Sequence, residues 1–263
     1  MIPLIYSQQD EASLSIGNFI KESYSVGDSG VINGKYGDFI LMGIRERHLY
    51  IDAETIVSGI TGSEKIEGIV FLSRHSSSAS ISSMTVHATG NISDAKLGGK
   101  PKTLSVAMPD LMTETLRNMH ANNKRKEIQV TYESTHHGPY CPNPCFYLEI
   151  GTTAREWTDK EILGTVVSSL LSSEKNGYGN FVGVGGGHYA PKFTGYVLGE
   201  KINIGHIIPK YHGNAITREI LEQSIEKTPG FKGMVMDFKG CNSDMRTLVR
   251  QLSSEIGCEL IEI

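Results

Sequence analysis

The sequence predicts an α/β fold, a single domain in which helices flank a mixed, mostly parallel central sheet. Short runs rich in β-branched and aromatic residues alternate with segments of helical periodicity, which is typical of a sheet covered by helices. The 263 residues are 39% hydrophobic and 21% charged, so the chain can bury a sizeable core. Because no repeat, low-complexity tract or long linker interrupts it, we expect residues 1–263 to form one domain.

Nine segments are predicted to be strands, because each combines strand-forming residues with turn-forming residues at its ends. Residues 76–99 are instead expected to be a long irregular stretch, although Met84-Thr85-Val86-His87 within it has the pattern of packed residues. In chain order the predicted strands are Ile2–Ser7, Asp38–Ile44, Gly68–Ser73, Thr103–Ala107, Glu127–Glu133, Cys145–Gly151, Asn180–Val184, Gly233–Phe238 and Cys258–Ile263.

Helices are predicted where apolar residues recur every three or four positions. The clearest helix begins at Thr158-Asp159-Lys160-Glu161, which has the pattern of a capping box, and its apolar face is expected in the core. A second helix begins after Pro109, with Asp110 as the expected N-cap. A third, over residues 245–256, ends at Gly257, where we expect a left-handed conformation. A weaker pattern near the N-terminus consists of Ala12, Ile16, Phe19 and Ile20.

Composition indicates a cytoplasmic protein without membrane contact. The longest apolar runs, such as residues 68–72, are far too short to cross a bilayer, and Met1-Ile2-Pro3 lacks the basic start of a secretory signal. The four cysteines are therefore expected to be reduced thiols. Cys141 and Cys145 have a ligand-like spacing, but no second cysteine pair completes a zinc knuckle, so we interpret them as two loop thiols.

The charge argues against a protein that coats nucleic acid, since the net charge is −4 and the pI is about 6.1. A local grip on RNA remains compatible with these values. The densest positive segment is Lys124-Arg125-Lys126, which by default is a solvated helix end and loop.

Five of the nine histidines follow a predicted strand or lie beside glycine: His75, His87, His136, His137 and His188. A single histidine in such a place is more often structural, but five together favour a functional site. Because the carboxyl ends of strands line a shared crevice in open α/β sheets, we expect His75 and His136 to meet there.

The neighbouring histidines His136 and His137 are predicted to point to opposite faces of an extended backbone, so that one of them enters a given site. Glu133 would share the direction of His137 if its strand continued. This would give a carboxylate–imidazole pair suited to proton transfer or to orienting a metal ligand.

Residues 183–191, Gly-Val-Gly-Gly-Gly-His-Tyr-Ala-Pro, form the most unusual stretch, because successive glycines are tolerated where backbone approaches a ligand closely. No Gly-Lys-Ser/Thr follows, so it is not a P-loop. We expect Pro191 to prevent a helix from presenting its N-terminus to a phosphate here, and a nucleoside triphosphate site is not expected. A sharp corner of the sheet is the alternative, but it would not explain His188 and Tyr189 at the tip.

The residue types also bear on the chemistry. Imidazole and carboxylate are zinc ligands, and an open position would allow zinc to activate water. No compact motif such as His-Glu-x-x-His is present, however, and without a metal a histidine could activate water toward an ester. The serines of residues 76–80 suggest a flexible lid by composition, but Gly-x-Ser-x-Gly is absent, so a serine triad is disfavoured. The possible zinc ligands are His75, Glu133, His136 and His188.

Four motifs together resemble the D-aminoacyl-tRNA deacylase family of archaea and plants. They are Leu72-Ser73-Arg74-His75, Thr85-Val86-His87-Ala88-Thr89-Gly90-Asn91, Ser134-Thr135-His136-His137-Gly138-Pro139 and Gly186-Gly187-His188-Tyr189-Ala190-Pro191, and Glu149-Ile150-Gly151 followed by Trp157 also fits. The resemblance implies hydrolysis of the ester between a D-amino acid and the terminal adenosine of tRNA. It also implies zinc dependence and a fold similar to peptidyl-tRNA hydrolases and nucleoside phosphorylases.

This resemblance leads to an expected role for each site residue. His75, His136 and His188 are expected in catalysis or metal ligation, and His87, His137 and Glu133 as orienting groups. The amides of Gly186 and Gly187 are candidate donors to an oxyanion, with Tyr189 as a pocket wall. Lys124, Arg125 and Lys126, with Lys192, are expected to contact tRNA phosphates.

Two other functions stay open from the sequence. One is a metal-assisted amidohydrolase or phosphorylase-like enzyme that acts on a small molecule in the same histidine crevice. The other is a non-enzymatic RNA-binding module, although neither a basic face nor exposed stacking aromatics are evident. We expect a monomer.

Overall fold

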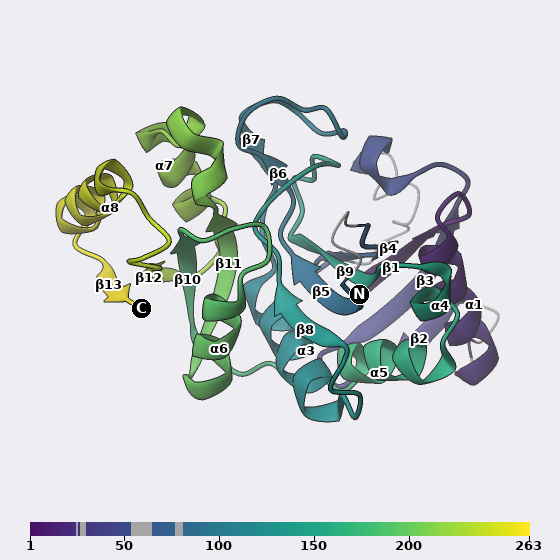
Figure 1. Ribbon diagram of the computed structural model, residues 1–263. Coiled ribbons are helices and arrows are strands. Elements are labelled where there is room, and N and C mark those ends of the chain that lie inside the picture. The colour runs from purple at the N-terminus through teal and green to yellow at the C-terminus, as the bar shows by residue number, and fades with distance from the viewer. Residues whose placement is uncertain (25, 27–29, 54–64, 77–80) are drawn as a thin grey trace.

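The computed structural model describes residues 1–24, 26, 30–53, 65–76 and 81–263 (Figure 1). Its strands are β1 (Ile2–Ser7), β2 (Val31–Asn33), β3 (Asp38–Ile44), β4 (Ile69–Arg74), β5 (Ser83–His87), β6 (Gly90–Asn91), β7 (Thr103–Leu104), β8 (Gln129–Tyr132), β9 (Cys145–Gly151), β10 (Gly179–Val184), β11 (Ile202–Ile208), β12 (Phe231–Met236) and β13 (Glu259–Glu262). Its helices are α1 (Glu11–Ser23), α3 (Pro109–Asn122), α4 (Ala154–Trp157), α5 (Lys160–Leu171), α6 (Pro191–Gly199), α7 (Arg218–Glu226) and α8 (Ser243–Ile256), with short 3-10 helices η1 (His48–Tyr50) and η2 (Lys210–Ala215).

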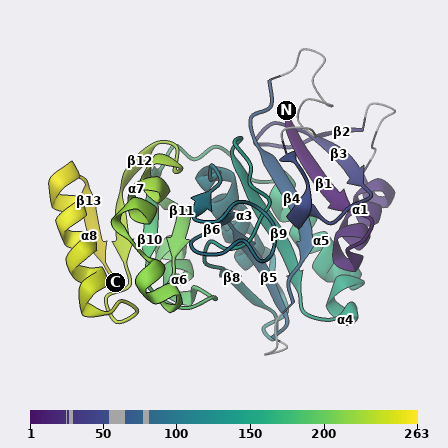
Figure 2. The ribbon, with the colours of Figure 1, turned by 90° about the horizontal axis from the view of Figure 1, so that it is seen from above.

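The strands form a seven-stranded sheet of order β2-β3-β1-β4-β9-β5-β8 and a four-stranded sheet of order β11-β10-β12-β13. In the larger sheet β2 pairs antiparallel with β3 and β5 antiparallel with β9, while the other neighbours are parallel. The smaller sheet is parallel throughout. Figure 2 shows the two sheets side by side, with α8 at the outer side of the smaller sheet, while α1 packs on the larger sheet beside β1 and β4. The predicted α/β class with a mixed, mostly parallel sheet is confirmed, and the separate smaller sheet was not foreseen.

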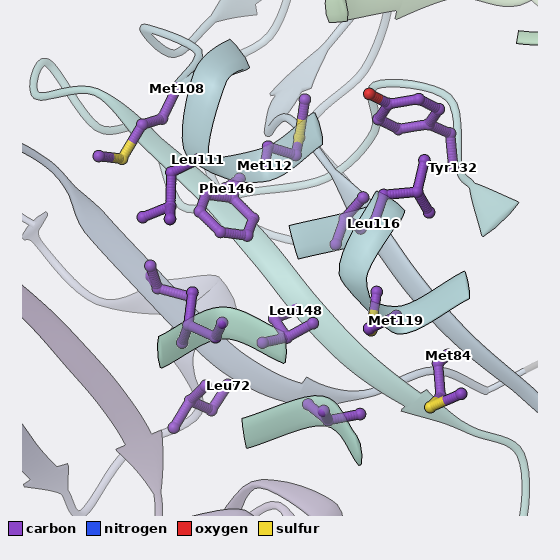
Figure 3. Close-up of a cluster of buried hydrophobic side chains, with 14 of the residues drawn as sticks. Leu72, Met84, Met108, Leu111, Met112, Leu116, Met119, Tyr132, Phe146 and Leu148 are labelled. Atoms are coloured by element: carbon purple, nitrogen blue, oxygen red, sulfur yellow. The ribbon is translucent and has the colours of Figure 1, made fainter. Parts of the chain in front are cut away.

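The main core lies between the larger sheet and helices α1, α3 and α5. Successive side chains of a strand point to opposite faces, so Phe146 and Leu148 of β9 face the helices while Tyr147 and Glu149 face away. Figure 3 shows Phe146 and Leu148 against Leu111 and the rest of the apolar stripe of α3. The stripe consists of Leu111, Met112, Leu116 and Met119, all fully buried.

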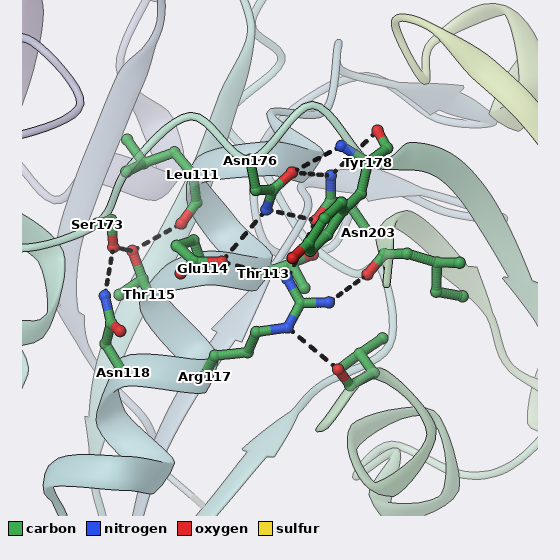
Figure 4. A network of polar contacts seen from close by, with 12 residues as sticks. Leu111, Thr113, Glu114, Thr115, Arg117, Asn118, Ser173, Asn176, Tyr178 and Asn203 are labelled. Atoms are coloured by element: carbon green, nitrogen blue, oxygen red, sulfur yellow. Dashed lines mark hydrogen bonds and ion pairs between the residues drawn. The ribbon is translucent and has the colours of Figure 1, made fainter. Parts of the chain in front are cut away.

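Helix α3 also holds the smaller sheet in place through Arg117. Its guanidinium donates to the carbonyl oxygens of Val197 at 3.1 Å and Ile202 at 2.5 Å, and to Oδ1 of Asn203 at 3.3 Å (Figure 4). Glu114 accepts from the same group at 3.2 Å. Buried residues of both sheets belong to one hydrophobic cluster, so the two layers share a core.

The residues predicted to cap two of the helices were wrong. The N-cap of α5 is Asp159, which accepts from the amides of Glu161 and Ile162, and the capping box lies one helix earlier, between Thr153 and Glu156 of α4. Helix α3 has no side-chain cap, and Asp110 lies in its first turn instead. The left-handed Gly257 after α8 is confirmed, with φ of 65°.

Pro191 does not prevent a helix, because it is the first residue of α6. Proline is favoured at that position, since the first amides of a helix have no partner within the helix and its fixed φ is already helical. The stretch expected to be irregular contains β5, an interior strand of the larger sheet, and β11 was missed. Among the described residues, no helix is both long and apolar enough to cross a membrane.

Candidate active site

The histidines gather on the face of the larger sheet that points away from α1, α3 and α5. His87, the last residue of β5, pairs with Tyr147 of β9, and Thr85 pairs with Glu149. Paired residues share a face of the sheet, so the side chains of His87, Tyr147 and Glu149 lie together. His75 follows directly after β4 and is buried beside them.

The expected meeting at a common carboxyl end was wrong in its geometry. β4 is parallel to β9, β9 is antiparallel to β5, and β5 is parallel to β8. The strands before His75 and Glu133 therefore run in opposite directions. The two side chains nevertheless meet, with Nδ1 of His75 at 2.9 Å from Oε1 of Glu133, because they converge over the open face of the sheet.

Glu133 is the centre of the first group of side chains. Its Oε2 lies 3.1 Å from Nε2 of His188 and 3.6 Å from Nε2 of His136. Each of His75, Glu133 and His188 offers one ligand atom within 4.8 Å of the other two. Glu133 was expected to pair with His137, but β8 ends at Tyr132, so the alternation on which that expectation rested does not continue.

His87, His136 and His137 form a second group that also brings its ligand atoms within 4.8 Å of one another. The ring centres of His136 and His137 are 4.3 Å apart, so the two rings do not point to opposite faces. His137 has a φ of 41°, a left-handed conformation that breaks the extended backbone on which the expectation depended. His136 thus belongs to this group, and its Nε2 also lies 3.6 Å from Oε2 of Glu133.

Glu149 is a site residue that was not assigned a role from the sequence. Its Oε2 lies 3.6 Å from Nδ1 of His75 and 3.7 Å from Nε2 of His87. One signal was present: a glutamate interrupts the apolar strand Cys-Phe-Tyr-Leu-Glu-Ile, and a buried carboxylate needs a partner.

The carboxylates and imidazoles shift one another's pKa strongly. Burial alone would lower the pKa of His75, but Glu133 and Glu149 outweigh burial and raise it to about 11. Burial likewise opposes ionisation of Glu149, yet His75 and His87 lower its pKa to about 2. In Glu133 the nearby His188 and His75 overcome burial and hold the pKa well below its usual range.

The second histidine group behaves differently. Burial, followed by the neighbouring His87 and His137, holds the pKa of His136 well below its usual range. Burial and His87 lower the pKa of His137 to about 4. Both imidazoles are therefore neutral at neutral pH. Nδ1 of His136 is 2.8 Å from the carbonyl oxygen of Ser134, so the proton resides on Nδ1 and leaves Nε2 able to accept.

The buried polar atoms of this site fit a metal ion. Within the part of the chain that the structure describes, no group forms a well-aligned hydrogen bond with Nε2 of His87 or with either carboxylate oxygen of Glu133, although all three atoms are buried. Such atoms are rarely left without a partner. Imidazole and carboxylate are also the donors that zinc accepts.

The glycine loop after β10 carries His188 and Tyr189 to the site. The Tyr189 hydroxyl lies 2.7 Å from Nε2 of His75. The amide of Gly186 donates to the carbonyl of Gly240 at 3.1 Å, so its expected role as an oxyanion donor was wrong. Among the described residues, no acceptor is seen for the amide of Gly187, which remains a candidate.

A cavity of about 370 Å³ opens beside these groups. It is lined by His75, His136, His137, His188 and Glu149, and also by residues without an expected role: Asp10, Arg47, His48, Ser73, Arg74 and Leu97. Arg74 belongs to the motif Leu72-Ser73-Arg74-His75, but no role was expected for it, and Arg47 lies in none of the four motifs. Only the fold shows that they reach this cavity.

The structure does not bring the three cations Lys124, Arg125 and Lys126, which were expected to contact tRNA phosphates, close to the histidines. Lys124, Arg125 and Lys126 precede β8, whereas Glu133 follows it, so they lie at the far end of that strand. Arg125 is already paired with Glu127 at 2.8 Å and Asp159 at 2.5 Å. Lys192 is the second residue of α6, beside the glycine loop, and its Nζ lies 2.5 Å from Oδ1 of Asp237.

The cysteines lie outside this site, and none of the four forms a disulfide. Cys141 and Cys145 are buried against the open face of the larger sheet, in a cluster with Phe71 and Tyr147. Of the serine-rich stretch, residues 77–80 lie outside the described residues.

Comparison with known proteins identifies the family. The family model for D-aminoacyl-tRNA deacylase matches residues 62–261. The D-aminoacyl-tRNA deacylase of Thermoplasma acidophilum is 41% identical over 262 residues, and that of Thermoplasma volcanium is 40% identical over 263 residues, each alignment covering 99% of both chains. That of Pyrococcus horikoshii is 32% identical over 273 residues, covering 98% of both chains.

Among solved structures, the crystal structure of a conserved protein of unknown function matches with a TM-score of 0.88 and 30% identity, covering 100% of this chain and 95% of that chain. The small-molecule and RNA-binding alternatives gain no support from these comparisons. The resemblance of the four motifs is confirmed, and the chain belongs to the D-aminoacyl-tRNA deacylase family.

Proposed function

We propose that this chain hydrolyses the ester bond of D-aminoacyl-tRNA and releases the free D-amino acid and the tRNA. The observation that carries the proposal is the buried carboxylate of Glu133, held between His75 and His188 beside a cavity of about 370 Å³. Perturbed titratable groups that converge on a cavity are typical of a catalytic site. Membership of the deacylase family gives this site its substrate.

In this proposal His136 is the general base. Its neutral Nε2 accepts a proton from a water molecule, whose oxygen attacks the carbonyl carbon of the ester. The bond from that carbon to the ribose oxygen then breaks, and the protonated His136 returns the proton to the ribose oxygen. The amide of Gly187 is the proposed donor to the transient oxyanion.

We further propose that zinc is held by His75, Glu133 and His188. When bound, zinc would polarise the ester carbonyl and lower the pKa of a nearby water. Without an ion, a proton on His75 balances the charge of Glu133, and this proton must leave before the imidazole can act as a ligand. The hydroxyl of Tyr189 is then placed to fix the orientation of the His75 ring.

For tRNA, we propose that Lys192 contacts a phosphate near the glycine loop, while Lys124, Arg125 and Lys126 contact only a distant part of the molecule. We also propose that the chain works in the cytoplasm as a monomer. Binding should weaken as salt rises if these lysines meet phosphates.

The test is the release of tyrosine from D-tyrosyl-tRNA and from L-tyrosyl-tRNA by the purified protein, before chelation, after chelation and after zinc is restored. We expect D-selective release that chelation abolishes and zinc restores. D-selective release that survives chelation would support the proposed function and contradict the zinc site. No release from either substrate would contradict the proposed function.

A further inference from the structure

A second cavity, of about 460 Å³, adjoins the reaction cavity. Leu49 lines both cavities. Three separate segments of the chain line both cavities: each places one residue in the reaction cavity and another residue in the second cavity. In η1 these are His48 and Tyr50, in the loop between β6 and β7 they are Leu97 and Lys100, and after β8 they are His137 and Tyr140.

The wall between the cavities is a tight backbone junction. A Cβ atom added to Gly98 would lie 1.6 Å from the carbonyl oxygen of Leu49, and one added to Gly138 would lie 2.8 Å from the same oxygen. Gly98 has a φ of 73°, which glycine adopts without strain. Close packing at this point fixes how far the second cavity lies from the histidines.

The second cavity has the chemistry of a site for a nucleotide. Tyr50 is 59% exposed although its neighbours His48 and Leu49 are buried, so its ring is open to a planar ligand. On another wall, Nζ of Lys100 lies 4.0 Å from the ring centre of Tyr140, which holds an ammonium group in place. Aromatic rings stack on bases and lysines neutralise phosphates, and the volume is within the usual range for small-molecule sites.

We propose that this cavity binds the terminal adenosine of the aminoacylated tRNA, with the adenine stacked on Tyr50 and its 5′-phosphate at Lys100. The inference rests on the proposed function, because the amino acid ester must then lie in the reaction cavity. Three peptide units separate His137 from Tyr140, so their Cα atoms are at most about 11 Å apart. This is comparable with the length of one nucleoside, which the substrate needs to span from ester to base.

Adenosine 5′-monophosphate is the probe. Titration of the full chain by calorimetry should show binding that Tyr50→Ala weakens about tenfold or more and that Tyr50→Phe retains, because stacking needs the ring and not the hydroxyl. Lys100→Gln should weaken binding and reduce its salt dependence, whereas Lys232→Gln, at an exposed lysine of β12 in the smaller sheet, should not. His188→Ala should leave nucleotide binding intact.

The kinetics distinguish the tRNA end from a free nucleotide. With D-tyrosyl-tRNA, Tyr50→Ala should raise KM about tenfold with little change in kcat, and adenosine 5′-monophosphate should inhibit competitively. Nucleotide binding without competition, or wild-type KM and nucleotide affinity in both Tyr50→Ala and Lys100→Gln, would overturn the inference while leaving the deacylase activity in place. If the protein released no amino acid at all, loss of nucleotide binding in Tyr50→Ala would still support the cavity, and absence of binding in the wild type would overturn it.

Discussion

Oε2 of Glu133 lies 3.1 Å from Nε2 of His188, and this contact joins the end of β8 in the larger sheet to the glycine loop of the smaller sheet. Backbone bonds reinforce it: the amide of Ser134 donates to the carbonyl of His188 at 2.8 Å, and that of Ala190 donates to Tyr132 at 2.9 Å. The site therefore depends on the packing of the two sheets against each other.

The first prediction concerns that packing. Arg117→Met should lower the free energy of unfolding by about 2–3 kcal/mol, because it leaves the carbonyl groups of Val197 and Ile202 without their charged donor. Denaturant unfolding measures this. Arg218→Met is the matched control, since Arg218 pairs with Glu222 and Glu255 at the exposed surface and should shift the midpoint far less. Equal shifts in both variants would contradict the role of Arg117.

Two glycines should respond in opposite directions. Gly98→Ala should destabilise the chain and raise KM, because its Cβ would collide with Leu49 at the junction of the two cavities. Gly195→Ala, within α6, should stabilise it by up to about 1 kcal/mol, since nothing lies within 4 Å of the added atom. Thermal unfolding and steady-state kinetics test both. A stable Gly98→Ala variant with wild-type KM would show that the junction does not shape the site.

Stability in acid should depend on Glu156. Although burial opposes its ionisation, bonds from the Thr153 side chain and amide, the Ser82 hydroxyl and the Thr152 amide lower its pKa to about 2. A carboxylate with a depressed folded pKa contributes stability above its unfolded pKa and loses it as pH falls through the folded pKa. Glu156→Gln should therefore cost about 1–3 kcal/mol at pH 7, and the deficit should shrink between about pH 5 and pH 2. A deficit independent of pH in that range would exclude this explanation.

Tyr189 should act through His75. Tyr189→Phe removes the hydroxyl that lies 2.7 Å from Nε2 of His75, and the loss of one such hydrogen bond should lower kcat about three- to tenfold. Tyr196→Phe, on α6, serves as the matched control. A wild-type kcat in Tyr189→Phe would show that the ring of His75 needs no such support.

Much of the fold could be predicted from local patterns, and the failures have physical reasons. β9 could be predicted because a continuous apolar run is typical of a strand buried on both faces. α8 could be predicted because its apolar residues recur at helical spacing and end at Gly257. β5 was hidden because its flanking serines suggested a loop, whereas its partners come from distant segments. The start of α6 was misjudged because Pro191 was taken to stop a helix, whereas proline is also favoured as the first residue of one.

The membership of the site was partly predictable and its geometry was not. Histidine placement predicted that His75, His136 and His188 belong to one site, and all three line the same cavity. The grouping of His136 with His87 and His137 depends instead on the left-handed backbone at His137 and on the reversed direction of β5. Neither feature could be predicted from the local sequence pattern. Tyr50, Lys100 and Tyr140 of the second cavity come from three separate segments that only the fold brings together.

The most direct test of the central claim is the single-turnover rate of D-tyrosyl-tRNA hydrolysis by Glu133→Gln, which removes the buried charge between His75 and His188 and preserves its shape. Glu127→Gln, an exposed glutamate before β8, is the matched control. The account predicts a fall of about 100-fold or more in Glu133→Gln, with folded protein confirmed by circular dichroism and a wild-type rate in the control. A folded Glu133→Gln variant with the wild-type rate would contradict it.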